Sequence, residues 1–413
     1  MIKFASASKQ VIPADPYYLM GYAGPVREQP ALGIHDIPEV NTLCIAVNDR
    51  PLIICVVDVC IISKTKSDLI KARLQARYGL EAEQISLIAI HSHSCPNGTG
   101  SPNRGFNKQL VNEPFYQMVS GAIEATVGSC LASLQTATAE YQSTMIDGYF
   151  SNRNDLKAPY DNQAISIHFY DINHHLLGIL FNIACHSTVL GPTNMYCSSD
   201  LIGTIRSKLK NHYQTNVVAA MATAGDISTR QYRQGDDFNE LERCAKGITE
   251  QLLKDPKSVK LELSQLKIKQ LKHVIDFDNR PFYPRYRQLL AETKALLADP
   301  HISKDQYKLS LTSSIKFENI LKVEQVHKEV FTKVYDLGSL KLIGFGGELS
   351  SKFGLAIKRA CPNALVMIMT CCDDHEGYFI EAEKYGLYYE TIASDIPQGD
   401  PEKITTSIIE SLK

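Results

Sequence analysis

Six apolar runs in this sequence each end in side chains that can do chemistry. In chain order, the residues that follow them are Asp58, His91-Ser92-His93, Cys185-His186-Ser187, Gly225-Asp226-Ile227-Ser228, Gly346-Gly347-Glu348, and Asp373-Asp374-His375 with Tyr378 shortly after. In open α/β sheets, binding sites lie beyond the carboxyl ends of the strands. Residues that are far apart in the sequence are therefore expected to converge at one edge of a sheet.

The residue types that would converge are histidine, glutamate and aspartate, with serine and tyrosine nearby. Neutral imidazoles together with a carboxylate are typical ligands of Zn²⁺, with one position left for water. Zn²⁺ lowers the pKa of such a water to ~7 and polarises a carbonyl group, which permits hydrolysis at neutral pH. Other divalent ions use the same ligands, so the pattern favours a metal-dependent hydrolase more firmly than it favours zinc.

Each of these residues also fits a simpler role. A histidine after a strand is often a cap or a hydrogen-bonded surface residue, and a lone His91-x-His93 pair is a weak metal signal. Asp226 fits a turn or a helix N-cap equally well. Asp373 and Asp374 keep a metal-dependent phosphoesterase open, although no second cluster of bridging carboxylates is evident.

The elements that must position these residues alternate along the chain. Continuous apolar runs, typical of strands covered on both faces, predict strands at Pro51–Val57, Ile85–Ile90, Leu177–Ala184, Val217–Ala222, Leu340–Gly344 and Ala364–Thr370. Helical periodicity predicts helices at Thr65–Tyr78, Asn112–Leu134, Asp200–Tyr213, Asp237–Lys254, Tyr283–Leu297, Ser351–Ala360 and Glu402–Leu412.

This alternation predicts an α/β fold with a mixed, largely parallel sheet flanked by helices on both faces. The stretch Glu140–Asp171 has a different residue pattern, which predicts antiparallel strands with a turn at Asp171–Asn173. A charged, helix-rich region from about 255 to 330 predicts a helical insertion. With no clear linker, we expect residues 1–413 to form a single catalytic domain.

Composition excludes several functional classes. The 413 residues carry 43 basic and 45 acidic side chains, a net charge of −2, which gives no electrostatic case for a nucleic-acid partner. The longest apolar run, 51–62, contains Asp58 and is too short for a transmembrane helix, which takes ~20 residues.

The N-terminus has no secretory signal pattern, and the eleven scattered cysteines suit buried, reduced thiols, so we expect a cytoplasmic protein. The oligomeric state is not predicted.

Read together, these motifs resemble those of the neutral/alkaline, non-lysosomal ceramidase family. The family's motifs are matched in order by Met20-Gly21-Tyr22, His91-Ser92-His93-Ser94, Ser151-Asn152-Arg153-Asn154, His186-Ser187, Gly225-Asp226-Ile227-Ser228, Gly346-Gly347-Glu348-Leu349 and the segment from Gly377-Tyr378 to Tyr389-Glu390 and Ser394. The order is collinear over nearly the whole chain, which makes the set more specific than any single motif.

The resemblance implies a Zn²⁺ ion held by His91, His186, Glu348 and Tyr378, and a metal-activated water that attacks the carbonyl of an N-acyl amide. It further implies that His93, Arg153 and Tyr389 move protons and stabilise the oxyanion. Arg153 has an alternative role as the partner of a site carboxylate. Ser228 would line the substrate site as a further catalytic residue. Asp226 would bind substrate through the loop that it holds.

The sequence departs from the family pattern near the substrate. Cys95 replaces a glycine, Thr229-Arg230 replace Pro-Asn, and Tyr378 lies in an Asp-Asp-His-Glu-Gly-Tyr context in place of Tyr-x-x-Tyr. The C-terminal β-sandwich of larger members has no counterpart in this sequence. The substrate is therefore expected to be a ceramide-type lipid amide or a smaller, soluble amide or ester.

Three other classes stay open at this point. They are the phosphoesterase, a non-catalytic metal-binding protein, and a nucleophilic enzyme that uses Ser228 or Cys95. The residues around Ser228 do not form a G-x-S-x-G elbow, which disfavours the serine mechanism.

Overall fold

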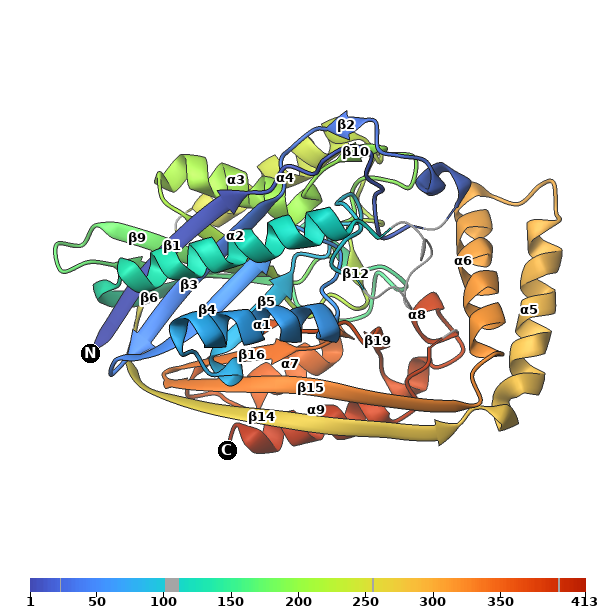
Figure 1. Cartoon of the computed structure of the whole chain (residues 1–413). Helices are drawn as coiled ribbons and strands as arrows, with labels where there is room; N and C mark the ends of the chain where they lie inside the picture. Colours follow the sequence, from blue (N-terminus) through green and yellow to red (C-terminus); the bar gives the residue numbers. More distant parts are fainter. Residues whose placement is uncertain (23, 101–110, 255, 393) are drawn as a thin grey trace.

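A computed structural model of the chain describes residues 1–22, 24–100, 111–254, 256–392 and 394–413 (Figure 1). Its larger sheet runs in the order β11-β9-β8-β6-β1-β3-β4-β5, with β13 added beside β6. The strands are β1 (Ile2–Gln10), β3 (Glu39–Val47), β4 (Arg50–Val57), β5 (Ile85–Ala89), β6 (Gln135–Met145), β8 (Gln163–Tyr170), β9 (Leu176–Ile183), β11 (Val217–Met221) and β13 (Val259–Leu261).

A smaller sheet follows in the order β14-β15-β16-β18. It contains β14 (Leu263–Asp278), β15 (Gln325–Gly338), β16 (Leu340–Phe345) and β18 (Leu365–Met369). Leu87 and Asp373 exchange backbone and side-chain hydrogen bonds, which joins the end of this sheet to β5 of the larger one. The main hydrophobic core contains residues of both sheets, including Leu340 and Met367 of the smaller one, and a second core lies on β15, β16 and β18 with α7 (Ser351–Arg359) and α9 (Asp400–Ser411).

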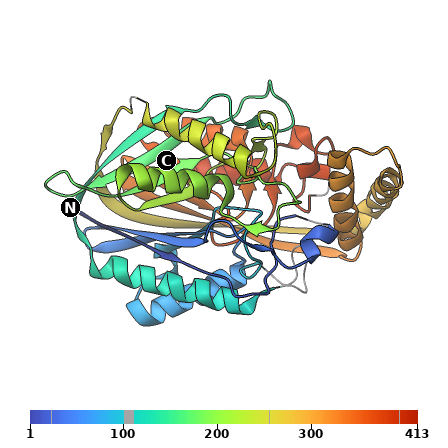
Figure 2. The ribbon, with the colours of Figure 1, turned by 90° about the horizontal axis from the view of Figure 1, so that it is seen from above.

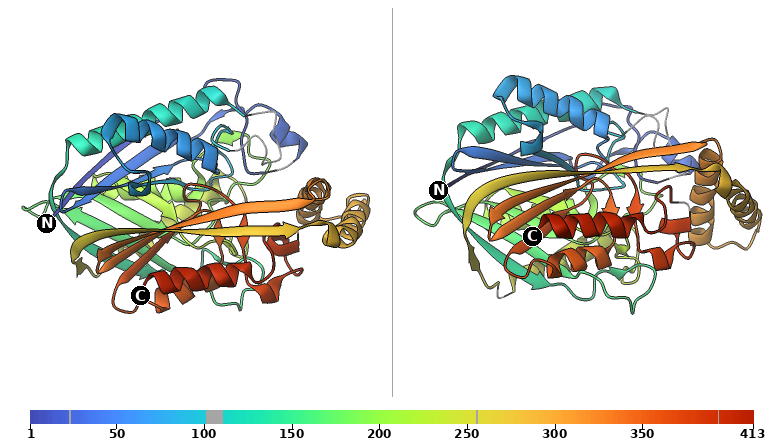
Figure 3. Two further views of the ribbon diagram at one scale, coloured as in Figure 1. Left: turned by 60° about the horizontal axis from the view of Figure 1, so that its bottom comes forward. Right: turned by 90° about the horizontal axis from the view of Figure 1, so that it is seen from below.

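Helices cover the sheets from several sides. α1 (Lys64–Tyr78) packs on α2 (Glu113–Ala132), which contacts β1 and β3. α3 (Asp200–Tyr213) contacts β11, and α4 (Phe238–Leu253) packs on α3; Figure 2 shows these two pairs on opposite sides of the strands. α7 and α9 cover the smaller sheet (Figure 3).

The α/β class and the mixed sheet predicted from the sequence are confirmed, but the share of parallel pairing differs. Within the larger sheet, only β11–β9 and β4–β5 are parallel, and the pairs between them are antiparallel. The physical reason is that a continuous apolar run reports burial on both faces and not strand direction. β11 contacts β3, β4 and β5 as well as β9, so the sheet folds over and buries both faces although most of its pairs are antiparallel.

The predicted elements have the expected types and nearly the expected bounds, including the antiparallel β6 and β8 within 135–170. The region from about 255 to 330 differs, and residue 255 itself lies outside the described residues. β14 and β15 form a long antiparallel hairpin, and only its tip is helical, with α5 (Tyr283–Leu297) and α6 (Lys304–Ile320) (Figure 3). The alternation of lysines with apolar residues in β14 is a period-two signal that charge content obscured.

Small strand pairs at the ends of the large strands bring the loops together. β17 (Glu348–Leu349) pairs in parallel with β19 (Tyr378–Phe379), and β7 (Ser151–Asn152) pairs with β12 (Ile227–Ser228). These short ladders fix segments from distant parts of the chain against one another. They carry Ser228, Glu348 and Tyr378 and lie next to Arg153 and Asp226.

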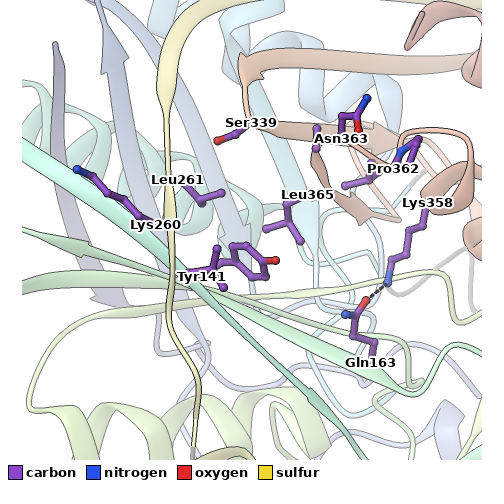
Figure 4. Close-up of a pocket in the computed structure, with 12 residues that line it drawn as sticks. Tyr141, Gln163, Lys260, Leu261, Ser339, Lys358, Pro362, Asn363 and Leu365 are labelled. Atoms are coloured by element: carbon purple, nitrogen blue, oxygen red, sulfur yellow. Dashed lines mark hydrogen bonds between the residues drawn. The ribbon is translucent and has the colours of Figure 1, made fainter.

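All eleven cysteines lie in the described part of the chain and are free thiols, as predicted; ten are buried. Among the described residues, no helix has both the length and the apolar character required to cross a membrane. An open cavity of about 370 Å³ lies between β13 and the loop before β18 and is lined by Tyr141, Lys260, Lys358 and Leu365 (Figure 4). None of the predicted site residues lines it.

A buried ion cluster ties the loop after β18 to its surroundings. The Asp373 carboxylate lies 2.6 Å from Lys71 Nζ and 2.8 Å from Lys333 Nζ, and all three side chains are buried. Burial raises the pKa of Asp373, but Lys333 and Lys71 outweigh burial and lower it to about 2. The carboxylate is therefore ionised at neutral and mildly acidic pH.

We expect Asp373→Ala to destabilise the protein by ~3–5 kcal/mol, because two buried ammonium groups lose their counter-charge. Denaturant unfolding at pH 7 measures this. Because the folded pKa lies below the ordinary value of 3.8, the difference between wild type and variant should shrink only as the pH falls from about 4 towards about 2. Asp68→Ala removes the exposed partner of Lys64 and serves as the control, with an expected effect of less than ~1 kcal/mol.

Candidate functional site

Four of the predicted site residues meet at the ends of strands from both sheets. His91 follows β5, His186 follows β9, and Glu348 and Tyr378 face each other in the β17–β19 ladder. The side chains of His91, His186 and Glu348 are nearly fully buried. The convergence expected from the sequence is therefore present for these residues.

Backbone carbonyl groups fix the orientation of both imidazoles. His91 Nδ1 lies 2.8 Å from the Cys60 carbonyl oxygen, and His186 Nδ1 lies 2.9 Å from the Ile227 carbonyl oxygen. A carbonyl oxygen only accepts hydrogen bonds, so each Nδ1 must carry the proton. In the neutral ring, the lone pair is then on Nε2, as a metal ligand requires.

The two Nε2 atoms point at the carboxylate of Glu348. His186 Nε2 lies 2.7 Å from Oε2 and His91 Nε2 lies 3.5 Å from Oε1. Among the described residues, neither His186 Nε2 nor Glu348 Oε2 has a hydrogen-bond partner of normal geometry. Buried atoms that carry lone pairs and face one another at this distance repel, unless a proton or a cation bound by both compensates them. The ligand atoms of these three residues lie within 4.8 Å of one another, as in a metal-binding group.

The ionisation states also suit a metal. Burial lowers the pKa of His91 to about 4, against the opposing effect of Glu348, so its imidazole is neutral at pH 7. Burial raises the pKa of Glu348, but His91 and His186 outweigh burial and hold it well below its ordinary value. Two imidazoles with Nε2 directed inward and an ionised carboxylate are a donor set that Zn²⁺ accepts, so the residues present fit this ion.

The pKa of the Tyr378 phenol is set by opposing neighbours. Burial and the nearby Glu348 raise the pKa of its phenol well above the ordinary value, and Arg153 opposes them. The guanidinium of Arg153 lies over the ring of Tyr378, 5.2 Å from its centroid. Tyr378 is therefore a neutral phenol unless a further positive charge lies beside it.

Arg153 forms a buried ion pair with Glu390, which sequence reasoning did not assign. Its Nη2 also donates to the Gly225 carbonyl oxygen at 2.9 Å. Burial lowers the pKa of Arg153, but Glu390 raises it above its ordinary value. Arg153 is thus in a salt bridge, but with Glu390 and not with a carboxylate that the sequence assigned to the site, and this pair holds the guanidinium against Tyr378. Tyr389 packs edge-on against Tyr378 with ring centroids 6.2 Å apart.

His93 lies beside the cluster, with its Nε2 3.2 Å from His91 Nε2. The Met20-Gly21-Tyr22 segment packs on it. Tyr22 meets the ring edge-on at 4.9 Å, and a Cβ at Gly21 would come within 2.4 Å of His93 Cγ. Gly21 also has φ +112°, so both its conformation and its contact with His93 require glycine.

Asp226 and Ser228 occupy the loop that supports His186. The Asp226 carboxylate accepts hydrogen bonds from the Ser351 backbone at 2.9 Å and from Asn152 Nδ2 at 2.7 Å, so the chain itself engages both oxygens. These hydrogen bonds join the Asp226 loop to β7 and to the start of α7. Ser228 is buried next to Ile227, and its Oγ accepts from the Arg230 backbone at 3.3 Å. Contact of either residue with substrate stays a prediction.

Two other sequence-based alternatives lose their support. Asp373 and Asp374 were the candidates for a second metal. Asp373 is paired with two lysines, and Asp374 accepts the Lys64 backbone N–H at the start of α1 at 2.9 Å. Neither belongs to a metal-capable group among the described residues. Cys95 is buried against the Ser198 carbonyl oxygen, and burial raises the pKa of its thiol, so it is a poor nucleophile.

Sequence reasoning missed the position of His375. Its Nε2 lies 2.8 Å from Glu348 Oε1, and its ring stacks on His91. Cys60 and Cys371 also lie close enough to His91 to form metal-capable groups with it. The signal for His375 was present, because Asp-Asp-His follows a predicted strand just as the other site residues do.

Comparisons with known proteins identify the family and the fold. The neutral/alkaline non-lysosomal ceramidase N-terminal family model matches residues 13–244, more than half of the chain. The neutral ceramidase from Pseudomonas aeruginosa superposes with a TM-score of 0.76 at 18% identity, covering 99% of this chain and 73% of that one.

A ceramidase solved in complex with C2 superposes with a TM-score of 0.74 at 16% identity, covering 99% of this chain and 74% of that chain. At these identities, the two structures establish the shared fold. No curated protein matches the sequence. The family match includes His91, His93, Arg153 and His186, and the structural matches extend over nearly the whole chain. This chain belongs to the neutral/alkaline non-lysosomal ceramidase family.

Proposed function

We propose that this protein is a zinc-dependent amidohydrolase that cleaves the N-acyl amide bond of a ceramide-type substrate. The proposal rests on one observation. The buried atoms His186 Nε2 and Glu348 Oε2 lie 2.7 Å apart, and His91 Nε2 lies beside them. Both imidazoles are oriented by carbonyl groups with their lone pairs inward. The family to which the chain belongs supports the reaction class.

His91, His186, Glu348 and Tyr378 would hold the ion. When bound, Zn²⁺ supplies a Lewis acid and a water of lowered pKa for attack on the amide carbonyl. Arg153 would favour ionisation of Tyr378, since its charge lowers the pKa of that phenol. Glu390 keeps Arg153 in place and compensates its buried charge.

His93, Tyr389 and Arg153 would do the acid–base and electrostatic work. His93 is next to His91 and would accept a proton from the attacking water and return it to the leaving amine. Burial raises the pKa of Tyr389 to about 12, so its hydroxyl keeps its proton at pH 7 and would donate a hydrogen bond to the developing oxyanion. Ser228 and the loop held by Asp226 would line the substrate site.

The substrate and setting are part of the proposal. A lipid amide is favoured by the family, and a smaller soluble amide or ester would use the same residues. We further propose that the chain forms one catalytic domain, supported by a main core that extends from Ile2 to Cys372, with about 255–330 as an insertion. Its free thiols support a reducing compartment, the cytoplasm.

Zinc content and amide cleavage test the function in one preparation. We expect protein purified without chelator to contain about one Zn²⁺ per chain by elemental analysis and to hydrolyse a short-chain fluorescent ceramide. Removal of the metal should abolish cleavage, and added Zn²⁺ should restore it. Zinc without ceramide cleavage would redirect the substrate to soluble amides and esters. Full activity in metal-free protein would refute the mechanism.

Substitutions separate the residues that hold the ion from those that act beside it. His91→Ala and His186→Ala should each lose the metal and the activity together, because each removes one of the buried ligands. His93→Ala should keep the metal and lower turnover by ~10²–10⁴-fold. Elemental analysis and kcat measured on the same samples distinguish the metal ligands from the residues that act beside the ion. Zinc loss in His93→Ala would show that His93 is itself a ligand.

Gly21→Ala tests whether the Met-Gly-Tyr segment positions His93. The new Cβ would collide with the His93 ring, so we expect kcat to fall by ~10–100-fold while zinc is retained. Gly148→Ala is the matched control, because Gly148 also has a positive φ, +80°, but no atom lies within 4 Å of the place that its Cβ would take. Equal loss of activity in both variants would attribute the effect to backbone strain alone.

A further inference from the structure

His375 approaches the proposed metal centre from outside the predicted ligand set. Its Nε2 lies 2.8 Å from Glu348 Oε1, and its ring stacks on that of His91 with centroids 5.4 Å apart and an interplanar angle of 18°. An ionised carboxylate only accepts hydrogen bonds, so Nε2 of His375 must be the donor. This residue stands in the segment where the sequence departs from the family pattern.

Three metal-capable groups among the described residues share His91. The first adds His186 and Glu348, the second adds Cys371 and His375, and the third adds Cys60 and His93. His91 offers only Nε2 as a ligand, since its Nδ1 donates to the Cys60 carbonyl oxygen. An ion in the second or the third group would leave Glu348 as a buried carboxylate without a cation, which is costly. The first group therefore takes the ion, and His375 is left to act on Glu348.

The two oxygens of Glu348 have unequal surroundings. Oε1 accepts from His375 and lies 3.5 Å from His91 Nε2. Oε2 has no hydrogen-bond partner of normal geometry among the described residues and lies 2.7 Å from His186 Nε2. A donor on one oxygen fixes the rotation of the carboxylate plane, so the other oxygen alone is directed at the ion.

The backbone that carries His375 is held from three directions. The His375 N–H donates to Asp374 Oδ1 at 2.8 Å, and the same oxygen accepts the Lys64 N–H at 2.9 Å. The Asp373 N–H donates to the Leu87 carbonyl oxygen at 2.6 Å, and the Glu376 N–H donates to that of Gly346 at 2.9 Å. A side chain on such an anchored segment can hold a partner to within the tolerance that a metal ligand needs.

We propose that His375 is a positioning residue whose Nε2–H holds Oε1 of Glu348, so that Oε2 alone faces the metal ion. The inference rests on the proposed function, because it requires an ion at Glu348. His375 also borders a cavity of about 170 Å³ with Ile61, Ser63 and Thr65. This space lets a substituted side chain fit at position 375 without repacking of the core.

Two variants at this position test the hydrogen bond. His375→Gln keeps an N–H donor of similar reach, whereas His375→Leu removes it. We measure the Zn²⁺ dissociation constant of the full-length chain by competition with a chromogenic chelator, together with the visible spectrum of the Co²⁺-loaded protein. His375→Leu should weaken Zn²⁺ binding by ~10–100-fold and shift the Co²⁺ bands, and His375→Gln should restore both.

His301→Leu, at an exposed histidine between α5 and α6, is the control and should leave the dissociation constant unchanged. Unchanged binding in His375→Leu would overturn the inference and leave the proposed function intact. Equal loss in both variants at position 375 would also overturn it, since His375 would then be required as an imidazole ligand. Wild-type protein that binds no Zn²⁺ would refute the proposed function and, with it, this inference. Thermal unfolding of each variant reports whether the chain is folded.

Discussion

Two hydrogen bonds from imidazole to backbone carbonyl decide what this site can do. Because the Cys60 and Ile227 carbonyl groups only accept, Nδ1 of His91 and of His186 carries a proton, and in the neutral ring each Nε2 presents its lone pair to the interior. Carbonyl groups cannot be exchanged by substitution, so the fold has to hold the loops that contain them. Near Cys60, the buried Asp58 does so by pairing with Arg206 and accepting from the Glu39 backbone and Ser199. Near Ile227, the β7–β12 ladder and Asp226 have this task.

Charge around the centre is compensated group by group. Asp58 is neutralised by Arg206, Arg153 by Glu390, and Asp373 by Lys71 and Lys333, each as a buried pair or cluster. Glu348 faces three imidazoles, and no lysine or arginine among the described residues forms an ion pair with it. A buried carboxylate in a setting where other charges are compensated is the natural place for an external cation.

The sequence was informative wherever one local signal decided the outcome. Apolar runs and helical periods predicted the types and bounds of the main elements, and the polar residues after β5, β9 and β16 pointed to His91, His186 and Glu348. Strand direction was not readable, since burial on both faces arises here from a folded-over sheet. The β14–β15 hairpin was missed because its lysines resembled a solvated helical region. The partners of Arg153 and Glu348, Glu390 and His375, depend on loops that only the tertiary structure brings together.

The ligands come from two hydrophobic cores. His91 and His186 adjoin Ile90 and Cys185 of the larger core, while Glu348 and Tyr378 adjoin Leu349 and Phe379 of the smaller one. An ion bound to all four side chains would link the two cores, and its binding free energy would stabilise their association. Attachment of the smaller core would then depend in part on that ion, and the chain without it would be looser there and more sensitive to proteases.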